Sequence, residues 1–163
     1  MKGNIVQRAK KLAFYGVKGT EGTTVYHRMK GFTKLETEKN PSEYSRQYVD
    51  ELFEETDVTG YSPAVAYEFD RYADDPVHQD MVALTDGEMV GDEAIRTLIM
   101  VDLAVPNDDG SYPAISRDFA VIPDSEGDGT DAYIYTGAFR AKGEKVFGSA
   151  SITGDKAVFT EQE

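Results

Sequence analysis

The sequence predicts a mainly β protein of the α+β class, in which antiparallel strands carry a single helix. Several segments alternate apolar and polar residues with period two and are rich in β-branched and aromatic residues. The breaks between them have the glycine, proline and aspartate content of turns. At 163 residues the chain suits one domain, residues 1–163.

The expected strands follow the alternating segments in chain order: 10–17, 24–32, 64–72, 94–105, 114–122, 131–141, 144–152 and 156–160. The late strands are long and joined by short turns, which favours an antiparallel meander. In the strand at 64–72 one face is apolar and should join the core: Val65, Tyr67 and Phe69. The other face is small and acidic: Ala66, Glu68 and Asp70.

One helix is predicted over about residues 75–86. Asp75 stands at an N-cap position, Pro76 at the first helical position, and Gly87 where a C′ glycine ends a helix. An apolar stripe at i, i+4 and i+7 would pack this helix on the sheet: Val77, Met81 and Leu84.

The segment at about 34–55 fits neither pattern, because it is long, polar and carries aromatic residues with little to pack against locally. Loops of this length are usually functional or disordered, and regularly placed aromatics argue against disorder. We expect an extended hairpin or arm that becomes ordered against a partner, ended by a turn in TDVTGYSP (56–63). The basic N-terminal segment, about 1–9, is expected to be flexible and lacks the apolar run of a signal peptide.

Charge is distributed unevenly along the chain. The net charge is −13, with +6 over residues 1–49, −13 over 50–93 and −6 over 94–163. A nucleic-acid ligand is disfavoured, because affinity for phosphates comes from a surplus of Lys and Arg. Either the acids serve solubility, or the asymmetry favours head-to-tail association between copies.

Nothing in the sequence indicates catalysis. There is no cysteine, His27 and His78 are isolated and expected at the surface, and no glycine-rich phosphate loop occurs. Paired carboxylates show no sign of the burial that would separate their pKa values: 54/55, 74/75 and 92/93. The longest apolar stretch is too short to span a membrane and is broken by Asp102. We expect no enzyme, no metal, no cofactor and no membrane partner.

The acid-rich segment at 124–131 matches an EF-hand calcium loop only in part. Acids and a glycine stand at positions 1, 3, 5 and 6, but position 12 is Tyr135 instead of a bidentate Glu. Its flanks are predicted strands, so a solvated hairpin loop is expected. A small β-sandwich module that binds carbohydrate or calcium through this loop is kept as the alternative function.

Five motifs follow one another between residues 40 and 103: YSRQYVDE, TDVTGYSP, FDRY, DPVHQDM and VGDEAIR. The region 40–103 and the run FAVIPDSEGDGTDAYIYTGAFRAKGE at 119–144 together span just over half of the chain. In these motifs and their order the chain resembles the major tail tube proteins of tailed bacteriophages and prophages of Gram-positive bacteria, the siphophage-type major tail protein family.

The resemblance implies an antiparallel β-sandwich with one flanking helix, whose inner sheets join around a six-fold axis into a closed β-barrel. It implies a structural virion protein: hexameric rings assemble in the host bacterial cytoplasm and stack into the tube through which DNA is ejected. Implied partners are further copies, the tape measure protein in the lumen, the tail terminator, and baseplate or distal tail proteins. A non-contractile tail, the inner tube of a contractile tail and a prophage-derived particle all remain open.

Two sets of site residues are expected from this resemblance. In the arm, contacts between subunits or rings should come from aromatic and Arg side chains, which dominate interface energetics: Tyr44, Arg46, Tyr48 and Phe53. The alternative is that they cap the subunit's own core. The lumen should be lined by acids that do not bind passing DNA: Glu68, Asp70 and Asp102. The alternation of apolar and polar residues shows that one face of a strand is polar, but it does not show whether that face lines the inside or the outside of a ring.

Overall fold

The computed structural model describes residues 3, 5–19 and 22–162, and within them the chain is mainly β with one α-helix. The strands are β1 (Lys11–Lys18), β2 (Thr24–Arg28), β3 (Phe32–Glu38), β4 (Pro41–Arg46), β5 (Glu55–Tyr61), β6 (Ala64–Asp70), β7 (Ile95–Asp102), β8 (Tyr112–Asp128), β9 (Ile134–Ala141), β10 (Val146–Thr153) and β11 (Lys156–Glu161). The helix is α1 (Pro76–Asp86), and two short 3-10 helices are η1 (Arg8–Lys10) and η2 (Gly91–Ala94). Residues 1, 2 and 4 of the segment expected to be flexible lie outside the described residues.

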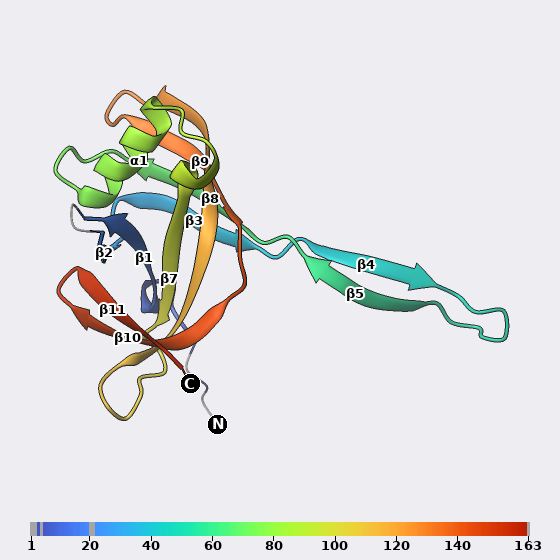
Figure 1. Ribbon diagram of the computed structural model, residues 1–163. Helices are drawn as coiled ribbons and strands as arrows, with labels where there is room; N and C mark the ends of the chain where they lie inside the picture. Colours follow the sequence, from blue (N-terminus) through green and yellow to red (C-terminus); the bar gives the residue numbers. More distant parts are fainter. Residues whose placement is uncertain (1–2, 4, 20–21, 163) are drawn as a thin grey trace.

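Nine strands form one antiparallel sheet in the order β10-β11-β2-β1-β7-β8-β9-β6-β3 (Figure 1). β10 also pairs with β8, so the ladders β8-β10-β11-β2-β1-β7 return to the strand where they begin. The 17 residues of β8 make this possible, because its first part pairs with β7 and β10 and its later part with β9.

The expected meander of the late strands is therefore wrong in one place. β8–β9 and β10–β11 are hairpins, but β9 pairs with β6 and β10 crosses over to β8. Local alternation predicts each strand but carries no information about which distant strand supplies its second ladder.

Two buried clusters form the core, and β1 separates them. One lies between α1 and the sheet and contains Tyr15, Tyr67, Phe69 and Phe139. The other lies on the opposite face of β1 and β7 and contains Phe14, Ile99, Val101, Ala114, Ala150 and Ala157. The inward face predicted for β6 is confirmed: Val65, Tyr67 and Phe69 are buried, whereas Ala66, Glu68 and Asp70 are only partly so.

Helix α1 begins as the sequence predicts. The Asp75 side chain accepts hydrogen bonds from the backbone N–H groups of Val77 and His78, and Pro76 occupies the first helical position. The end differs by one residue, because Gly87 remains right-handed at φ −77° and Glu88 takes the left-handed conformation at φ 47°. The bonds Glu88 N–H to Thr85 O and Met89 N–H to Leu84 O form a Schellman motif around Glu88.

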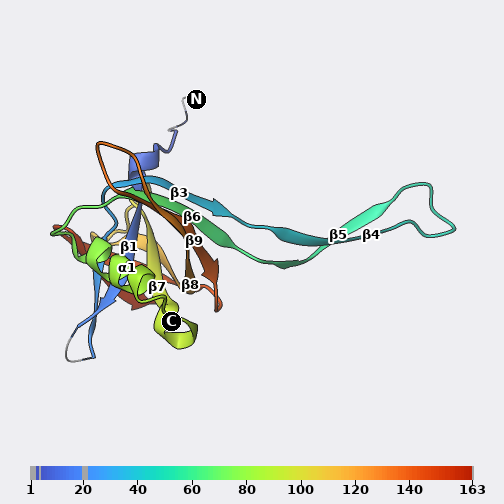
Figure 2. The same ribbon diagram turned by 90° about the horizontal axis from the view of Figure 1, so that it is seen from above.

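The predicted arm is a two-stranded hairpin with shifted boundaries. Residues 34–38, expected in the arm, belong to β3 in the main sheet, and the predicted turn at 56–63 is mostly strand β5. The hairpin of β4 and β5 projects away from the body in both views (Figures 1 and 2). Neither of its faces packs against the core, so its strands carry no hydrophobic alternation that sequence patterns could detect.

Candidate assembly interface

The hairpin places three of the four predicted contact residues in solvent. Tyr44 is 57% exposed, Tyr48 49% and Phe53 79%, and none of them joins either core cluster. The structure therefore does not use these side chains to cap the subunit's own core. Exposed aromatic side chains on a projecting element are typical of a surface that is covered by a partner.

Arg46 has a different role within the hairpin. Its guanidinium lies over the rings of Tyr44 and Tyr48, at 5.2 and 5.7 Å from the ring centroids. It also pairs with Asp57 at 2.5 Å and Glu55 at 3.5 Å across the β4–β5 ladder. An isolated two-stranded hairpin is marginal in water, so these cross-strand contacts help to hold the arm extended before any partner is bound.

The tip of the hairpin, residues 47–54, combines exposed apolar groups with negative charge. Val49, Leu52 and Phe53 are among the most exposed apolar side chains of the described chain, with Leu52 89% exposed. The acids of the tip are Asp50, Glu51 and Glu54. The sequence analysis named Phe53 but missed Val49 and Leu52. They could have been found as apolar residues in an acidic segment that lacks the periodicity of a strand or a helix.

Glu68 and Asp70 lie on the face of β6 that points away from α1. Strand register places Ala66 and Glu68 beside Ala138 and Thr136 of β9, and places Ile122 of β8 beside Ala138. The Glu68 carboxylate accepts a hydrogen bond from the Thr33 hydroxyl at 3.0 Å. This face is small, partly exposed and carries acids, as the alternation of β6 predicts.

Asp102 does not share that face. Ala66 pairs with Ala138, and Ala138 pairs with Ile122. From Ile122 back to Ala114, the partner of Val101 in β7, β8 has no register shift, so Asp102 points to the opposite side. There it pairs with Lys11 at 3.5 Å. The three acids predicted as one lumen-facing set are thus divided by the sheet, which sequence spacing between separate strands could not reveal.

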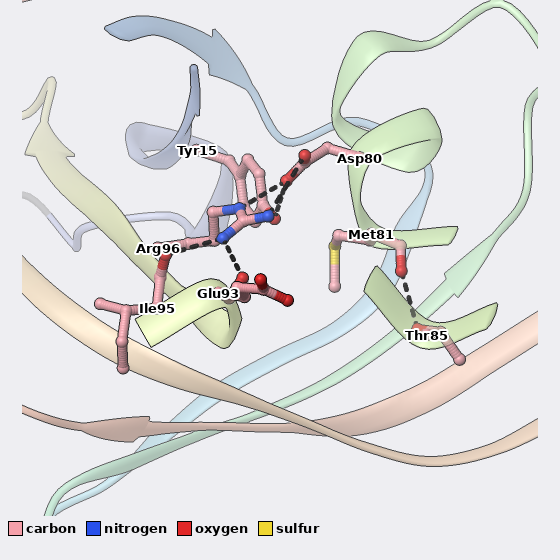
Figure 3. A network of polar contacts seen from close by, with 7 residues as sticks. All are labelled: Tyr15, Asp80, Met81, Thr85, Glu93, Ile95 and Arg96. Atoms are coloured by element: carbon pink, nitrogen blue, oxygen red, sulfur yellow. Dashed lines mark hydrogen bonds and ion pairs between the residues drawn. The ribbon is translucent and has the colours of Figure 1, made fainter. Parts of the chain in front are cut away.

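A partly buried polar network joins the helix to the sheet (Figure 3). The Tyr15 hydroxyl donates to the Asp80 carboxylate at 2.5 Å, and Arg96 Nε pairs with the same carboxylate at 2.7 Å. Arg96 also donates to the backbone carbonyls of Glu93 and Ile95. Burial, reinforced by the Asp80 charge, raises the pKa of Tyr15 above its ordinary value, so the phenol stays protonated and acts as a structural tie.

His78, expected at the surface, is fully buried. Its Nδ1 accepts the Tyr72 backbone N–H at 3.0 Å, so Nε2 carries the proton and donates to the Lys30 carbonyl at 2.7 Å. The ring stacks on Phe69 at 4.6 Å. Its position in the first turn of α1, facing β3 and β6, decides this burial, and an isolated histidine in the sequence gives no sign of it.

The acid-rich segment at 124–131 is not a loop over most of its length. Residues up to Asp128 belong to β8, and Ser125 and Glu126 pair with Thr136 and Tyr135 of β9. Across the described ranges, no group of three or more His, Cys, Asp or Glu side chains is placed to hold a metal ion. Nor does any described helix have the length and apolar character that a membrane crossing requires.

No family model matches this chain, and neither does any curated protein. Among solved structures, the fold is similar to a chain of the "Cryo-EM structure of the anti-feeding prophage (AFP) baseplate, 6-fold symmetrised". The TM-score is 0.52 at 10% sequence identity, and the match covers 90% of this chain and 97% of the other. The likeness is one of fold along nearly the full length of both chains.

Proposed function

We propose that this chain is a structural subunit of a phage tail or a phage-derived particle, and more specifically its major tail tube protein. The observation that carries the proposal is the projecting β4–β5 hairpin, whose aromatic and apolar side chains are left exposed by the subunit itself. The fold shared with a prophage baseplate chain, over 90% of this chain, supports the broader part of this proposal, a structural role in a phage tail or phage-derived particle. Its role is assembly, without catalysis or a cofactor.

Rings form when sheets join between neighbouring copies. β3 is the last strand of the nine-stranded sheet, and residues 121–128 of β8 pair only with β9. The antiparallel sheet β8-β9-β6-β3 therefore has an open edge on each side, and an exposed edge is a template for pairing with another chain. Six copies joined edge to edge close these sheets into an inter-subunit barrel, the inner wall of a sandwich-like ring.

The face of that sheet that points away from α1 becomes the wall of the lumen in this proposal. It carries Glu68 and Asp70 beside the small residues Ala66 and Ala138. Carboxylates repel DNA phosphates over about a Debye length, ~8 Å at physiological salt, so DNA passes without adhering. Asp102 lies on the other face and is left out of the proposed lumen.

The remaining proposed partners follow from the geometry of a tube. Stacked rings enclose the tape measure protein, and the two ends meet the tail terminator and baseplate or distal tail proteins. Assembly takes place in the host bacterial cytoplasm, and the product is part of the virion. A sheath gene beside this one would assign the tube to a contractile tail, and its absence to a flexible tail.

Electron microscopy of the concentrated protein in moderate salt tests the proposal. Rings or tubes about 100 Å wide are expected for six domains of this size around a channel. Leu52→Ser/Phe53→Ser should retain the fold by circular dichroism but lose stacked rings. Val90→Ser is the matched control, because Val90 on the body is 79% exposed, as is Phe53. A protein that stays monomeric in every condition, or tip variants that stack normally, would overturn the proposal.

A further inference from the structure

The face of the sheet that α1 covers is not covered along its whole length. Beyond the helix lies a cavity of about 310 Å³ between β1, β7 and β8 on one side and β3 and β6 on the other. Its floor is apolar: Leu35, Val65, Leu98, Met100 and Phe119. We call it the basal pocket, because Lys39 and Pro63, at the base of the hairpin, also line it.

The rim of the basal pocket is basic in a chain that is strongly acidic overall. Its charged residues are Arg8, Lys11, Lys39, Arg117 and Lys145, and no acid lines it. Within the described chain, Lys11 alone of these five has a carboxylate partner, Asp102 at 3.5 Å. The neighbouring Lys39 amine, followed by burial, lowers the pKa of Lys145, which shows that positive charge is crowded here.

The tip of the hairpin has the complementary composition. Residues 47–54 carry three acids, no base, and exposed Val49, Leu52 and Phe53. An apolar floor inside a basic rim suits apolar side chains that are flanked by carboxylates. The acids would steer the encounter, and burial of the apolar groups would supply most of the affinity.

The tip cannot reach the basal pocket of its own subunit. Lys39 and Pro63, which line this pocket, adjoin the two strands of the hairpin. The hairpin then extends away from the body (Figure 2). Eight residues, 39–46, separate Glu38 from the first residue of the tip, a distance of about 30 Å at ~3.3 Å per residue. The occupant must therefore come from another molecule.

We propose that the basal pocket receives the hairpin tip, residues 47–54, of a second copy of this chain. Leu52 and Phe53 enter the apolar floor, and Asp50, Glu51 and Glu54 face the basic rim. The contact joins different surfaces of two copies, so it is heterologous and propagates from subunit to subunit. It rests on the proposed function, for which it names the partner surface of the arm.

Directed disulfide formation tests the contact, since the chain has no native cysteine. A protein carrying Leu52→Cys is mixed with a differently tagged protein carrying Thr37→Cys, whose side chain lines the basal pocket. Mild oxidation should give the mixed dimer. The control partner carries Lys18→Cys, at the far end of β1 from the pocket residue Lys11, and should give at most a trace.

Charge reversal provides a second test of the contact. Lys39→Glu/Lys145→Glu should weaken the contact by at least about tenfold, because it places like charges in apposition. Glu51→Lys/Glu54→Lys in the partner should restore it, whereas Lys18→Glu should leave it unchanged. A tip cysteine that crosslinks equally to position 18, or charge reversals without effect, would overturn the basal pocket as the acceptor.

Microscopy of the wild-type protein separates this inference from the function on which it rests. Rings or tubes without the 52–37 crosslink overturn the pocket and leave the tube protein intact. A crosslink without rings keeps the pocket contact and overturns ring assembly. Neither crosslink nor rings overturns both.

Discussion

Tyr15 and Asp80 are joined by a hydrogen bond of 2.5 Å that ties strand β1 to helix α1. Arg96 Nε of β7 pairs with the same Asp80 oxygen, Oδ2, at 2.7 Å. Tyr15 lies 65 positions before Asp80 in the chain, and Arg96 lies 16 positions after it. The helix is therefore fixed on the sheet by a partly buried polar network as well as by its apolar stripe, and this network has consequences for stability at high pH.

Stability should fall on the alkaline side, and Tyr15 should account for part of the fall. Burial raises the pKa of Tyr15 in the folded protein, whereas an unfolded tyrosine ionises near pH ~10. The stabilising contribution is therefore complete below that pH and is lost as the pH rises beyond it. Urea unfolding of wild type and Tyr15→Phe between pH 8 and 11 measures this. Tyr15→Phe should start less stable, by about 1 kcal/mol, and lose less with pH. Equal slopes would contradict the assignment.

Gly137→Ala should destabilise the sheet, because β9 approaches its neighbours too closely there for a side chain. A Cβ at Gly137 would lie 2.5 Å from the Tyr67 hydroxyl oxygen and 2.5 Å from the Ile122 carbonyl oxygen. We expect a loss of about 1–3 kcal/mol, typical of overpacking. Gly143→Ala is the control, since nothing lies within 4 Å of the corresponding Cβ. Thermal unfolding that gives similar values for both would disprove the close approach.

Glu88→Gly should stabilise the end of α1. Glu88 holds φ at 47°, a conformation that costs a residue with a Cβ roughly 1–2 kcal/mol. Part of this gain is offset by the greater freedom of glycine in the unfolded chain, so we expect a net gain of about 0.5–1 kcal/mol. Gly87→Ala probes the neighbouring site and should give no gain, because φ is already −77° and an added Cβ would lie 3.0 Å from the Ala83 carbonyl oxygen. Denaturant midpoints that rank the two variants oppositely would contradict this.

Glu68→Lys/Asp70→Lys should make assembled tubes retain DNA. Two lysines on each copy would add phosphate contacts along the lumen, and the retention should weaken steeply as salt is raised. Asp108→Lys/Glu144→Lys makes the same charge change in exposed loops and should retain much less. Retention of a short DNA fragment against salt concentration measures the difference. Equal retention by both variants would place Glu68 and Asp70 outside the lumen.

Local sequence patterns predicted much of the fold. The start of α1 follows from Asp75 and Pro76, because N-cap hydrogen bonding and the fixed φ of proline act within one turn. The buried face of β6 follows from period-two alternation, because one of its sides packs against a core. β3, β4 and β5 were expected only as an extended hairpin or arm and its closing turn, without strand limits, because these strands are largely exposed on both faces.

The candidate interface was likewise predictable from the sequence only where it depends on neighbouring residues. The sequence by itself determined that an aromatic, acidic arm exists and that β6 has one acidic face, since both are properties of neighbouring residues. Only the tertiary structure decided that Asp102 lies across the sheet from Glu68, that His78 is buried, and that distant basic residues surround one apolar pocket. These depend on strand register and on contacts between residues far apart in the chain, and such pairings are selected by the packing of the whole core.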